Sequence, residues 1–222
     1  MDVTVTIIKT GYSSINSESN IMKANCTCTL VENGKFKLII DTLTAWDGEF
    51  LTQELKKRGV ELNDVTHAVA THGHSDHIGN LNLFKNAVHI VGQSLSHKDE
   101  YQLYSFDEGG PYKISPNIEI IATPGHTLSD VSVIVKNTTL GTVAIVGDLF
   151  EREEDIRHPD LWKITAGSEN PELQIKNRRK ILNSIDYVIP GHGPGFKGHK
   201  DVALIMAIRS LSKEALLQEI SG

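Results

Sequence analysis

The chain has 222 residues, of which 39% are hydrophobic and 23% charged. This composition is typical of an ordinary soluble globular protein, and nothing in it calls for a membrane segment. The formal net charge of −6 argues against a protein that grips nucleic acid along a broad face, because phosphate binding depends on lysine and arginine. We expect one domain over residues 1–222, since a chain of this length can bury a sizeable core.

The chain begins with a predicted strand. Residues 1–8 alternate apolar side chains with threonine, and no basic start precedes a long apolar core, so we expect no signal peptide. The protein should therefore stay inside the cell, in the cytoplasm, with the nucleus as a second expected location. Cys26 and Cys28 would share one face of a strand at a Cα separation of about 6 to 7 Å, too far for an unstrained disulfide. Both should be reduced, as is usual in the cytosol.

A β-hairpin is the clearest local prediction. The apolar runs 21–31 and 36–41 flank Asn33 and Gly34. Asn-Gly is the strongest short hairpin signal, because both residues tolerate positive φ. The two runs should therefore pair as antiparallel strands.

The other elements follow from periodicity and turn residues. Asp47 should cap a helix that presents Phe50, Leu51 and Leu55 on one face and ends at Gly59. Further strands are expected at 65–70, 87–91, 118–122, 130–135, 142–146 and 187–189. A short helix is expected to start within residues 78–84, and longer helices are expected over 171–182 and 201–218. Residues 101–110 are polar and glycine-rich, which predicts a loop, placed where a lid could be.

A metal-binding loop follows the predicted strand 65–70. It reads Thr71-His72-Gly73-His74-Ser75-Asp76-His77. At a strand end His72 and His74 point to the same side and can bind one ion, while Asp76 and His77 follow as the chain turns and can reach a second. Imidazole and carboxylate ligands suit zinc, and also iron or manganese. A lone histidine is usually a packing residue, but this density of ligand-type side chains favours a metal site.

Three later loops carry the same kind of side chain. His126 follows Pro124-Gly125, Asp148 follows Gly147, and His192 lies in Pro190-Gly191-His192-Gly193-Pro194, each after a predicted strand. Glycine or proline beside each of them lets the backbone turn sharply. We therefore predict one ion on His72, His74 and His126, a second on Asp76, His77 and His192, and Asp148 as a bridge between them. The other histidines, His67, His89, His97, His158 and His199, are assigned to packing or solvent.

These motifs resemble the metallo-β-lactamase superfamily of dinuclear metal hydrolases. T-H-G-H-S-D-H at 71–77, P-G-H at 124–126, G-D at 147–148 and P-G-H-G-P at 190–194 stand in the order of that superfamily. The resemblance covers essentially the whole chain. It implies an α+β fold, a four-layer αββα sandwich in which two mixed β-sheets face each other, helices cover the outside, and the metals lie along one edge.

A closer resemblance points to one branch of the superfamily. It rests on residues 130–133, 140–143, 147–152, 168–171 and 190–196 and on Arg178. That branch is associated with cleavage of histone pre-messenger RNA at its 3′ end, with two zinc ions and a dimeric state. The resemblance implies an endoribonuclease with two zinc ions per chain, a single-stranded RNA substrate and a homodimer, with iron or manganese as other metals.

The expected mechanism depends on the metals. Two divalent ions lower the pKa of a water between them from about 15.7 to roughly 7, which supplies a nucleophile at neutral pH. Asp148 would hold the ions about 3.5 to 4 Å apart, and Asp76 could orient the nucleophile or take its proton. We therefore predict Asp148 and Asp76 as catalytic residues.

Two features could serve an RNA substrate. Lys176, Arg178, Arg179 and Lys180 before the last metal loop, and Lys197 and Lys200 after it, could form a basic rim, although charges on an exposed helix are usually only a solvated face. The aromatic side chains of the predicted loop could stack bases, although covering an apolar gap is the simpler interpretation. These are Tyr101, Tyr104 and Phe106.

Three alternatives stay open. A thioesterase of the glyoxalase II type, acting on small molecules, is the main one. A mononuclear iron dioxygenase of the persulfide-oxidising kind resembles the same motif but uses only part of it, so the intact set Asp76, His77 and His192 favours the hydrolase. A non-catalytic binding protein on the same scaffold would have lost ligands, and none of the predicted ones is lost.

Overall fold

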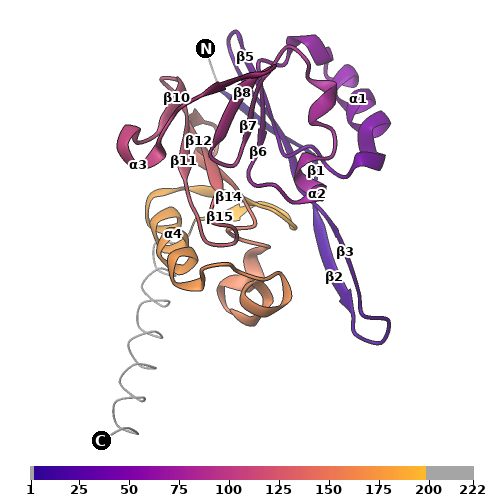
Figure 1. Ribbon diagram of the computed structural model, residues 1–222, viewed down its shortest axis with the longest axis vertical. Helices are drawn as coiled ribbons and strands as arrows, with labels where there is room; N and C mark the ends of the chain where they lie inside the picture. Colours follow the sequence, from indigo (N-terminus) through magenta and orange to yellow (C-terminus); the bar gives the residue numbers. More distant parts are fainter. Residues whose placement is uncertain (1–2, 199–222) are drawn as a thin grey trace, which may run out of the picture.

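The computed structural model describes residues 3–198, and the predicted helix 201–218, His199 and Lys200 lie outside this range. Its strands form a seven-stranded sheet, a six-stranded sheet and a separate two-stranded hairpin (Figure 1). In spatial order the first sheet contains β1 Thr4–Lys9, β4 Cys28–Asn33, β5 Phe36–Ile40, β6 His67–Ala70, β7 Val88–Val91, β8 Ser94–His97 and β9 Glu100–Gln102. The second contains β10 Tyr112–Ser115, β11 Ile118–Ala122, β12 Val131–Thr138, β13 Gly141–Gly147, β14 Tyr187–Pro190 and β15 Phe196–Lys197.

The helices are fewer and mostly short. The α-helices are α1 Gly48–Lys57, α2 Ser75–Ile78, α3 Phe106–Gly109 and α4 Pro171–Ser184. Other helical turns are η1 Ala45–Asp47, η2 Leu62–Asp64, η3 Leu81–Leu83, η4 Glu153–Ile156 and η5 Leu161–Thr165. No helix within residues 3–198 has the length and apolar character needed to cross a membrane.

Three apolar clusters define the layers. The central one joins buried residues of both sheets, such as Leu38 of β5 and Val133 of β12, and so lies between them. A second packs α1 against the outer face of the first sheet, and a third packs α4 against the outer face of the second. Figure 1 shows α1 and α4 on opposite sides of the two sheets. The predicted αββα sandwich is confirmed.

The alternation of side chains along each strand explains this layering. On β12, Val131, Val133 and Val135 belong to the central cluster, whereas Ile134 points the other way, toward α4. Successive side chains of a strand face opposite sides of a sheet, so an apolar run without polar gaps covers both faces. The near-continuous apolar pattern of these strands is therefore the pattern of a sheet buried on both sides.

The parallel strands position the functional edge. β5, β6 and β7 are parallel neighbours, as are β13 and β14, while the other pairs are antiparallel. The carboxyl ends of parallel strands meet at the same edge of a sheet, and ligand sites gather there. The segments that carry Asp41, the metal-binding loop, Asp148 and His192 all leave the sheets at such ends.

The predicted hairpin of β4 and β5 is confirmed, with its turn one residue later than predicted. Asn33 pairs with Phe36, so the two turn residues are Gly34 and Lys35. Gly34 adopts a φ of 61°, a conformation that glycine reaches without a steric penalty.

The prediction of one strand over 21–31 is wrong. β3, Ile21–Asn25, pairs with the unpredicted strand β2, Tyr12–Asn16, and the two project from the body as an arm (Figure 1). Thr27 lies between β3 and β4, and its backbone N–H donates to the Gly191 carbonyl at 2.6 Å. This contact between distant segments is not visible in the local pattern. Cys26 and Cys28 are buried free thiols, in agreement with the prediction that they are reduced.

Three further local predictions fail. Asp47 precedes α1 but makes no capping hydrogen bond, because its carboxylate accepts from Lys9, Asn25 and Thr44 instead. Phe50 is 39% exposed and does not join the buried face of α1. The predicted loop 101–110 contains part of β9 and the whole of α3, whose Phe106 is buried.

Candidate metal centre

The structure brings all the predicted ligand side chains to one edge of the sandwich. His72 and His74 lie in the loop after β6, and Asp76 and His77 lie in α2. The other three follow strands of the second sheet: His126 comes after β11, Asp148 after β13 and His192 after β14. Their role as ligands stays a prediction, and their geometry can be compared with what an ion needs.

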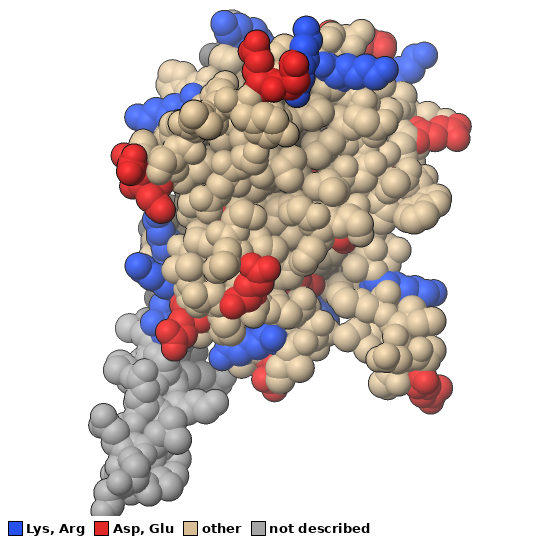
Figure 2. Space-filling view, viewed as in Figure 1, with Lys and Arg blue, Asp and Glu red and all other residues tan. Residues whose placement is uncertain are grey.

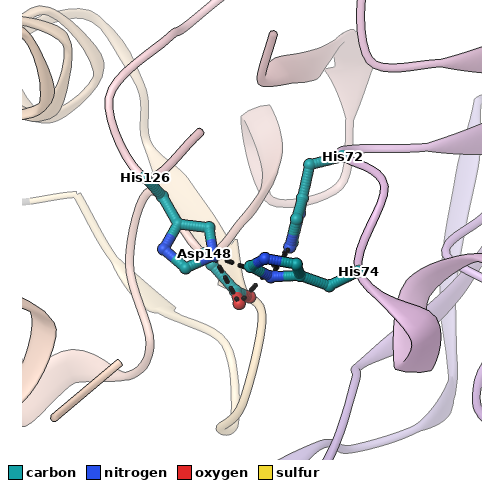
Figure 3. A group of neighbouring side chains, drawn as sticks. All are labelled: His72, His74, His126 and Asp148. Carbon is teal, nitrogen blue, oxygen red and sulfur yellow. Dashed lines mark hydrogen bonds and ion pairs between the residues drawn. The ribbon is translucent and has the colours of Figure 1, made fainter. Parts of the chain in front are cut away.

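The first group contains three imidazoles and one carboxylate (Figure 3). His72 Nε2 lies 2.8 Å from His74 Nδ1, and His126 Nε2 lies 3.1 Å from the same atom. Asp148 Oδ2 lies 3.4 Å from His126 Nε2 and 3.7 Å from His72 Nε2. Zinc binds nitrogen and oxygen at about 2.0 to 2.2 Å, so atoms this far apart can surround one ion.

The second group shares Asp148 with the first. Asp76 Oδ2 lies 3.8 Å from Nε2 of both His77 and His192. Asp148 reaches the same two histidines, with Oδ1 3.3 Å from His77 Nε2 and Oδ2 3.2 Å from His192 Nε2. Asp148 therefore faces both groups, as the sequence predicted for a bridging carboxylate.

Buried polar atoms without partners fit this interpretation. Asp76 Oδ2, His77 Nε2 and Asp148 Oδ1 are buried and have no hydrogen-bond partner within residues 3–198. A buried polar atom without a partner is expensive, and such atoms are rare in folded proteins. All three point into the two groups, so metal ions there would satisfy them.

Four of the histidines are held through their other ring nitrogen. The Nδ1 atom of His126 lies 2.9 Å from the Gly167 carbonyl, and that of His192 lies 3.0 Å from the Asn25 carbonyl. A carbonyl can only accept, so Nδ1 carries a proton, and Nε2 is the atom whose lone pair an ion would bind after displacing any proton there. His72 and His77 turn their Nδ1 atoms toward the first sheet.

Asp41 connects His72 and His77. Its Oδ2 lies 3.0 Å from His77 Nδ1. The Thr71 hydroxyl donates to Asp41 and lies 3.2 Å from Nδ1 of His72, which can donate to it in turn. The Thr71 backbone N–H also donates to Asp41, at 2.8 Å. One buried carboxylate thus orients two ligand-type histidines. The sequence contained a signal for this residue, because Asp41 follows β5 as the metal-binding loop follows β6.

Without a metal, the centre is strongly coupled electrostatically. Burial and the neighbouring His77 lower the pKa of His72 well below its ordinary value. Burial alone would lower the pKa of His192, but the Asp148 carboxylate raises it to about 9. Burial opposes the charge of Asp148 as well, but His77 and His192 hold the pKa of this carboxyl well below its usual range. Without a metal, a proton on His192 would thus supply part of the positive charge that a cation would bring.

Two glycines allow the loops to approach this closely. Gly147 has a φ of 52°, and a Cβ there would collide with the Thr71 hydroxyl. A Cβ on Gly191 would collide with Asp148 Oδ1. Both positions therefore exclude larger residues beside Asp148.

The predicted basic rim is only partly present. Arg178 is fully buried and pairs with Asp155, Nη2 to Oδ1 at 2.5 Å, so its assignment to a rim is wrong. Lys176 and Lys180 are exposed on α4. Lys197 is exposed on β15. Helical spacing alone did not separate the one arginine that faces the core from the lysines that face solvent.

The comparisons with known proteins agree with the fold. Residues 23–118 match the Metallo-beta-lactamase superfamily. The chain belongs to this superfamily and has the characteristics of a metal-dependent hydrolase, with clustered histidine and aspartate side chains at the expected edge.

Within the superfamily, two relatives share a name. Metallo-beta-lactamase domain-containing protein 1 of Xenopus laevis is 43% identical over 87% of this chain and 81% of its own length. The protein of the same name from Homo sapiens is 41% identical over 84% of this chain and 69% of its own length.

Solved structures share the fold at lower identity. A metallo-beta-lactamase-like protein of Thermotoga maritima superposes with a TM-score of 0.64 and 22% identity, covering 89% of this chain and 100% of that one. A dizinc quorum-quenching lactonase gives a TM-score of 0.60 and 19% identity over 78% of this chain and 74% of its own.

Proposed function

We propose that the protein is a dinuclear metal hydrolase that cleaves RNA phosphodiester bonds. The observation that carries the dinuclear part is the position of Asp148. Its Oδ1 lies 3.3 Å from His77 Nε2 and its Oδ2 3.2 Å from His192 Nε2 in the second group, while Oδ2 also lies 3.4 Å from His126 Nε2 in the first. The single-stranded RNA substrate rests on the sequence resemblance and on the surroundings of the site.

The residues divide the chemical work. Divalent ions bound here would supply a Lewis acid and lower the pKa of a bound water to about 7. Asp148 holds the two ligand groups together as one unit. Asp76 keeps Oδ2 without a hydrogen-bond partner, so this oxygen can orient a nucleophile or accept its proton. The Nδ1 partners of His126 and His192 are backbone carbonyls, which keep these rings fixed during the reaction.

A side pocket beside His126 favours an anionic substrate. Its volume is about 520 Å³, and Lys176 and Lys180 of α4 line it together with Pro124, two residues before His126. Figure 2 shows basic side chains along the edge of the molecule where α4 lies. The two lysines of this pocket would bind a phosphate of the RNA backbone, and they matter more in a chain whose formal net charge is −6.

A second candidate is hydrolysis of a small thioester, ester or lactone. The same pocket has apolar walls, formed in part by Phe106, Ile121 and Leu173, which could hold an acyl chain. A solved N-acyl homoserine lactone hydrolase with its product at the catalytic metal centre shares the fold, with a TM-score of 0.62.

One experiment separates the two candidates. Zinc-reconstituted protein is incubated with end-labelled single-stranded RNA and, in parallel, with short acyl thioesters and lactones, using Asp148→Ala as the inactive control. RNA cleavage that is absent in the variant, and weakened by Lys176→Met with Lys180→Met, supports the phosphodiesterase. Turnover of thioester or lactone only would support the second candidate, and turnover of neither would count against both.

The homodimer also stays a prediction, which light scattering of the purified protein would test.

A further inference from the structure

Glu151 is a buried carboxylate at the metal centre that the sequence patterns did not single out. It lies three residues after Asp148 and is 3% exposed. Its Oε1 has no hydrogen-bond partner within residues 3–198, and its Oε2 accepts from the Ser13 hydroxyl at 3.2 Å. A carboxyl group buried in this way is normally paired, protonated or bound to a metal.

The geometry places this carboxylate on the ligand side of His192. Glu151 Oε2 lies 4.0 Å from His192 Nε2, the ring nitrogen that faces the site. Ligand atoms of Glu151, Asp148 and His192 all lie within 4.8 Å of one another. Two atoms bound to one ion at about 2.0 to 2.2 Å can be separated by at most about 4.4 Å, and the 4.0 Å between Glu151 Oε2 and His192 Nε2 lies within this limit.

The surrounding network fixes the Glu151 backbone. The Glu151 N–H donates to Asp155 Oδ2 at 2.7 Å, and its carbonyl accepts from the His192 N–H at 2.8 Å. Asp155 is itself held by the buried Arg178, which also donates to the Leu149 carbonyl at 2.7 Å. The segment between Asp148 and Asp155 is thus tied to α4 and to the last metal loop. Such support holds a functional side chain in place.

We propose that Glu151 is a further ligand of the metal centre, which binds the ion held by Asp76, His77 and His192. This inference rests on the proposed dinuclear site. A direct carboxylate ligand gives the second position more oxygen donors than the first, which is built mainly from imidazoles. Oxygen donors suit harder ions, so the second position should accept manganese more readily than the first.

The test is equilibrium metal binding by the full-length, metal-free protein. Zinc is titrated against a chelating dye for the wild type and for Glu151→Gln, which keeps the volume and an oxygen acceptor for Ser13 but loses the charge. One of the two binding steps should lose at least roughly 10-fold in affinity, the effect already typical of losing an outer partner of a ligand, while the other step stays unchanged. Glu154→Gln in the same segment is the matched control, because Glu154 is exposed, and it should bind as the wild type does.

A second variant separates ligation from a purely electrostatic role. Glu151→Asp keeps the charge but withdraws the carboxylate by one methylene, so a direct ligand is lost and the same binding step should fall as it does in Glu151→Gln. It also serves if Glu151→Gln does not fold. With cobalt in the site of Asp76, His77 and His192, both variants should change the visible absorption bands, which report coordination.

The outcomes are distinct. Two binding steps with wild-type affinities in both variants would overturn the role of Glu151 but leave the dinuclear site intact. A single step in the wild type would overturn the dinuclear site itself. If Ser13→Ala alone reproduced the loss seen in Glu151→Gln, Glu151 would act by anchoring the arm and not as a ligand.

Discussion

Asp41 shows how much one buried carboxylate can contribute without touching a reacting atom. It accepts from Thr71 and faces His77 Nδ1, while its own φ is 56°, a conformation that aspartate tolerates better than most residues. Because it fixes the orientation of His77 directly and of His72 through Thr71, it acts on both ligand groups. Its contribution is to position the rings and to keep their site-facing nitrogens available.

The first prediction concerns this residue. Asp41→Asn keeps the volume and the tolerance for positive φ but removes the charge beside His77. Outer partners of metal ligands typically contribute 10- to 100-fold in affinity, so zinc binding should weaken by roughly that factor. Chelator competition measures the change, and Asp64→Asn, an exposed position on η2, is the control. Unchanged binding in Asp41→Asn would show that the histidines are held by packing alone.

The second prediction concerns pH. Asp148 and Asp41 overcome the effect of burial and raise the pKa of His77 well above its ordinary value, and Asp148 raises that of His192 to about 9. At pH 7 the metal-free site therefore holds protons that an incoming ion must displace. Zinc affinity should rise from pH 6 to pH 9, with proton release measurable by calorimetry in buffers of different ionisation enthalpy. An affinity independent of pH, with no released protons, would contradict the assigned charges.

At the scale of elements, α4 supports the metal loops from outside the sandwich. Asn170 caps the helix by accepting from the Leu173 N–H. Three side chains of α4 then donate to loop carbonyls: Asn177 to Pro124, Gln174 to Asp148 and Arg178 to Leu149. The His126 and Asp148 loops are thereby attached to one rigid element. Arg178 also stacks on Phe150, with its guanidinium carbon 4.0 Å from the ring centroid.

The third prediction follows from this buried arginine. Arg178→Met keeps much of the side-chain volume but leaves Asp155 buried without its cation. Breaking one partner of a buried ion pair typically costs about 3 to 5 kcal/mol, so the free energy of unfolding should fall by that amount in urea. Lys180→Met on the exposed face of the same helix should change it by less than about 0.5 kcal/mol. Equal effects of the two variants would show that the pair does not stabilise the fold.

A fourth prediction concerns a buried histidine in the middle of the first sheet. Burial lowers the pKa of His67 on β6 from 6.5 to about 4. Above pH 6.5 the His67 side chain is neutral in both the folded and the unfolded chain, and the stability is at its full value. As pH falls from 6.5 toward 4, the unfolded chain binds a proton that the folded chain does not, so the free energy of unfolding decreases. Between pH 7.5 and pH 4.5, with chelator present, this should remove about 2 to 3 kcal/mol of stability. His67→Asn should lose less over that interval, and an equal loss in both proteins would contradict the shift.

At the scale of the whole molecule, sequence reasoning succeeded where structure is local. His72, His126, Asp148 and His192 each follow a strand, so their convergence could be expected once the strands were predicted. It failed where segments far apart in the chain meet. The arm of β2 and β3 depends on contacts of Tyr12 and Asn25 with His192, more than 160 residues away.

The role of Glu151 was missed for the same reason. In the sequence it lies in a charged stretch that resembles a solvated loop, and only the surrounding elements bury it. Arg178 was misjudged because a helical pattern of charges does not reveal which charge has a partner in the core. Both residues belong to one network that joins the Asp148 loop, η4 and α4.

The most direct test of the central claim is a count of bound divalent ions per chain. We expect about two ions in the wild type, about one in His74→Ala and in Asp76→Ala, and weakened binding of both in Asp148→Ala, with the sandwich still folded in each case. That pattern would establish two ligand groups joined by Asp148. A single ion in the wild type that Asp76→Ala does not affect would contradict it and favour a mononuclear centre on His72, His74 and His126.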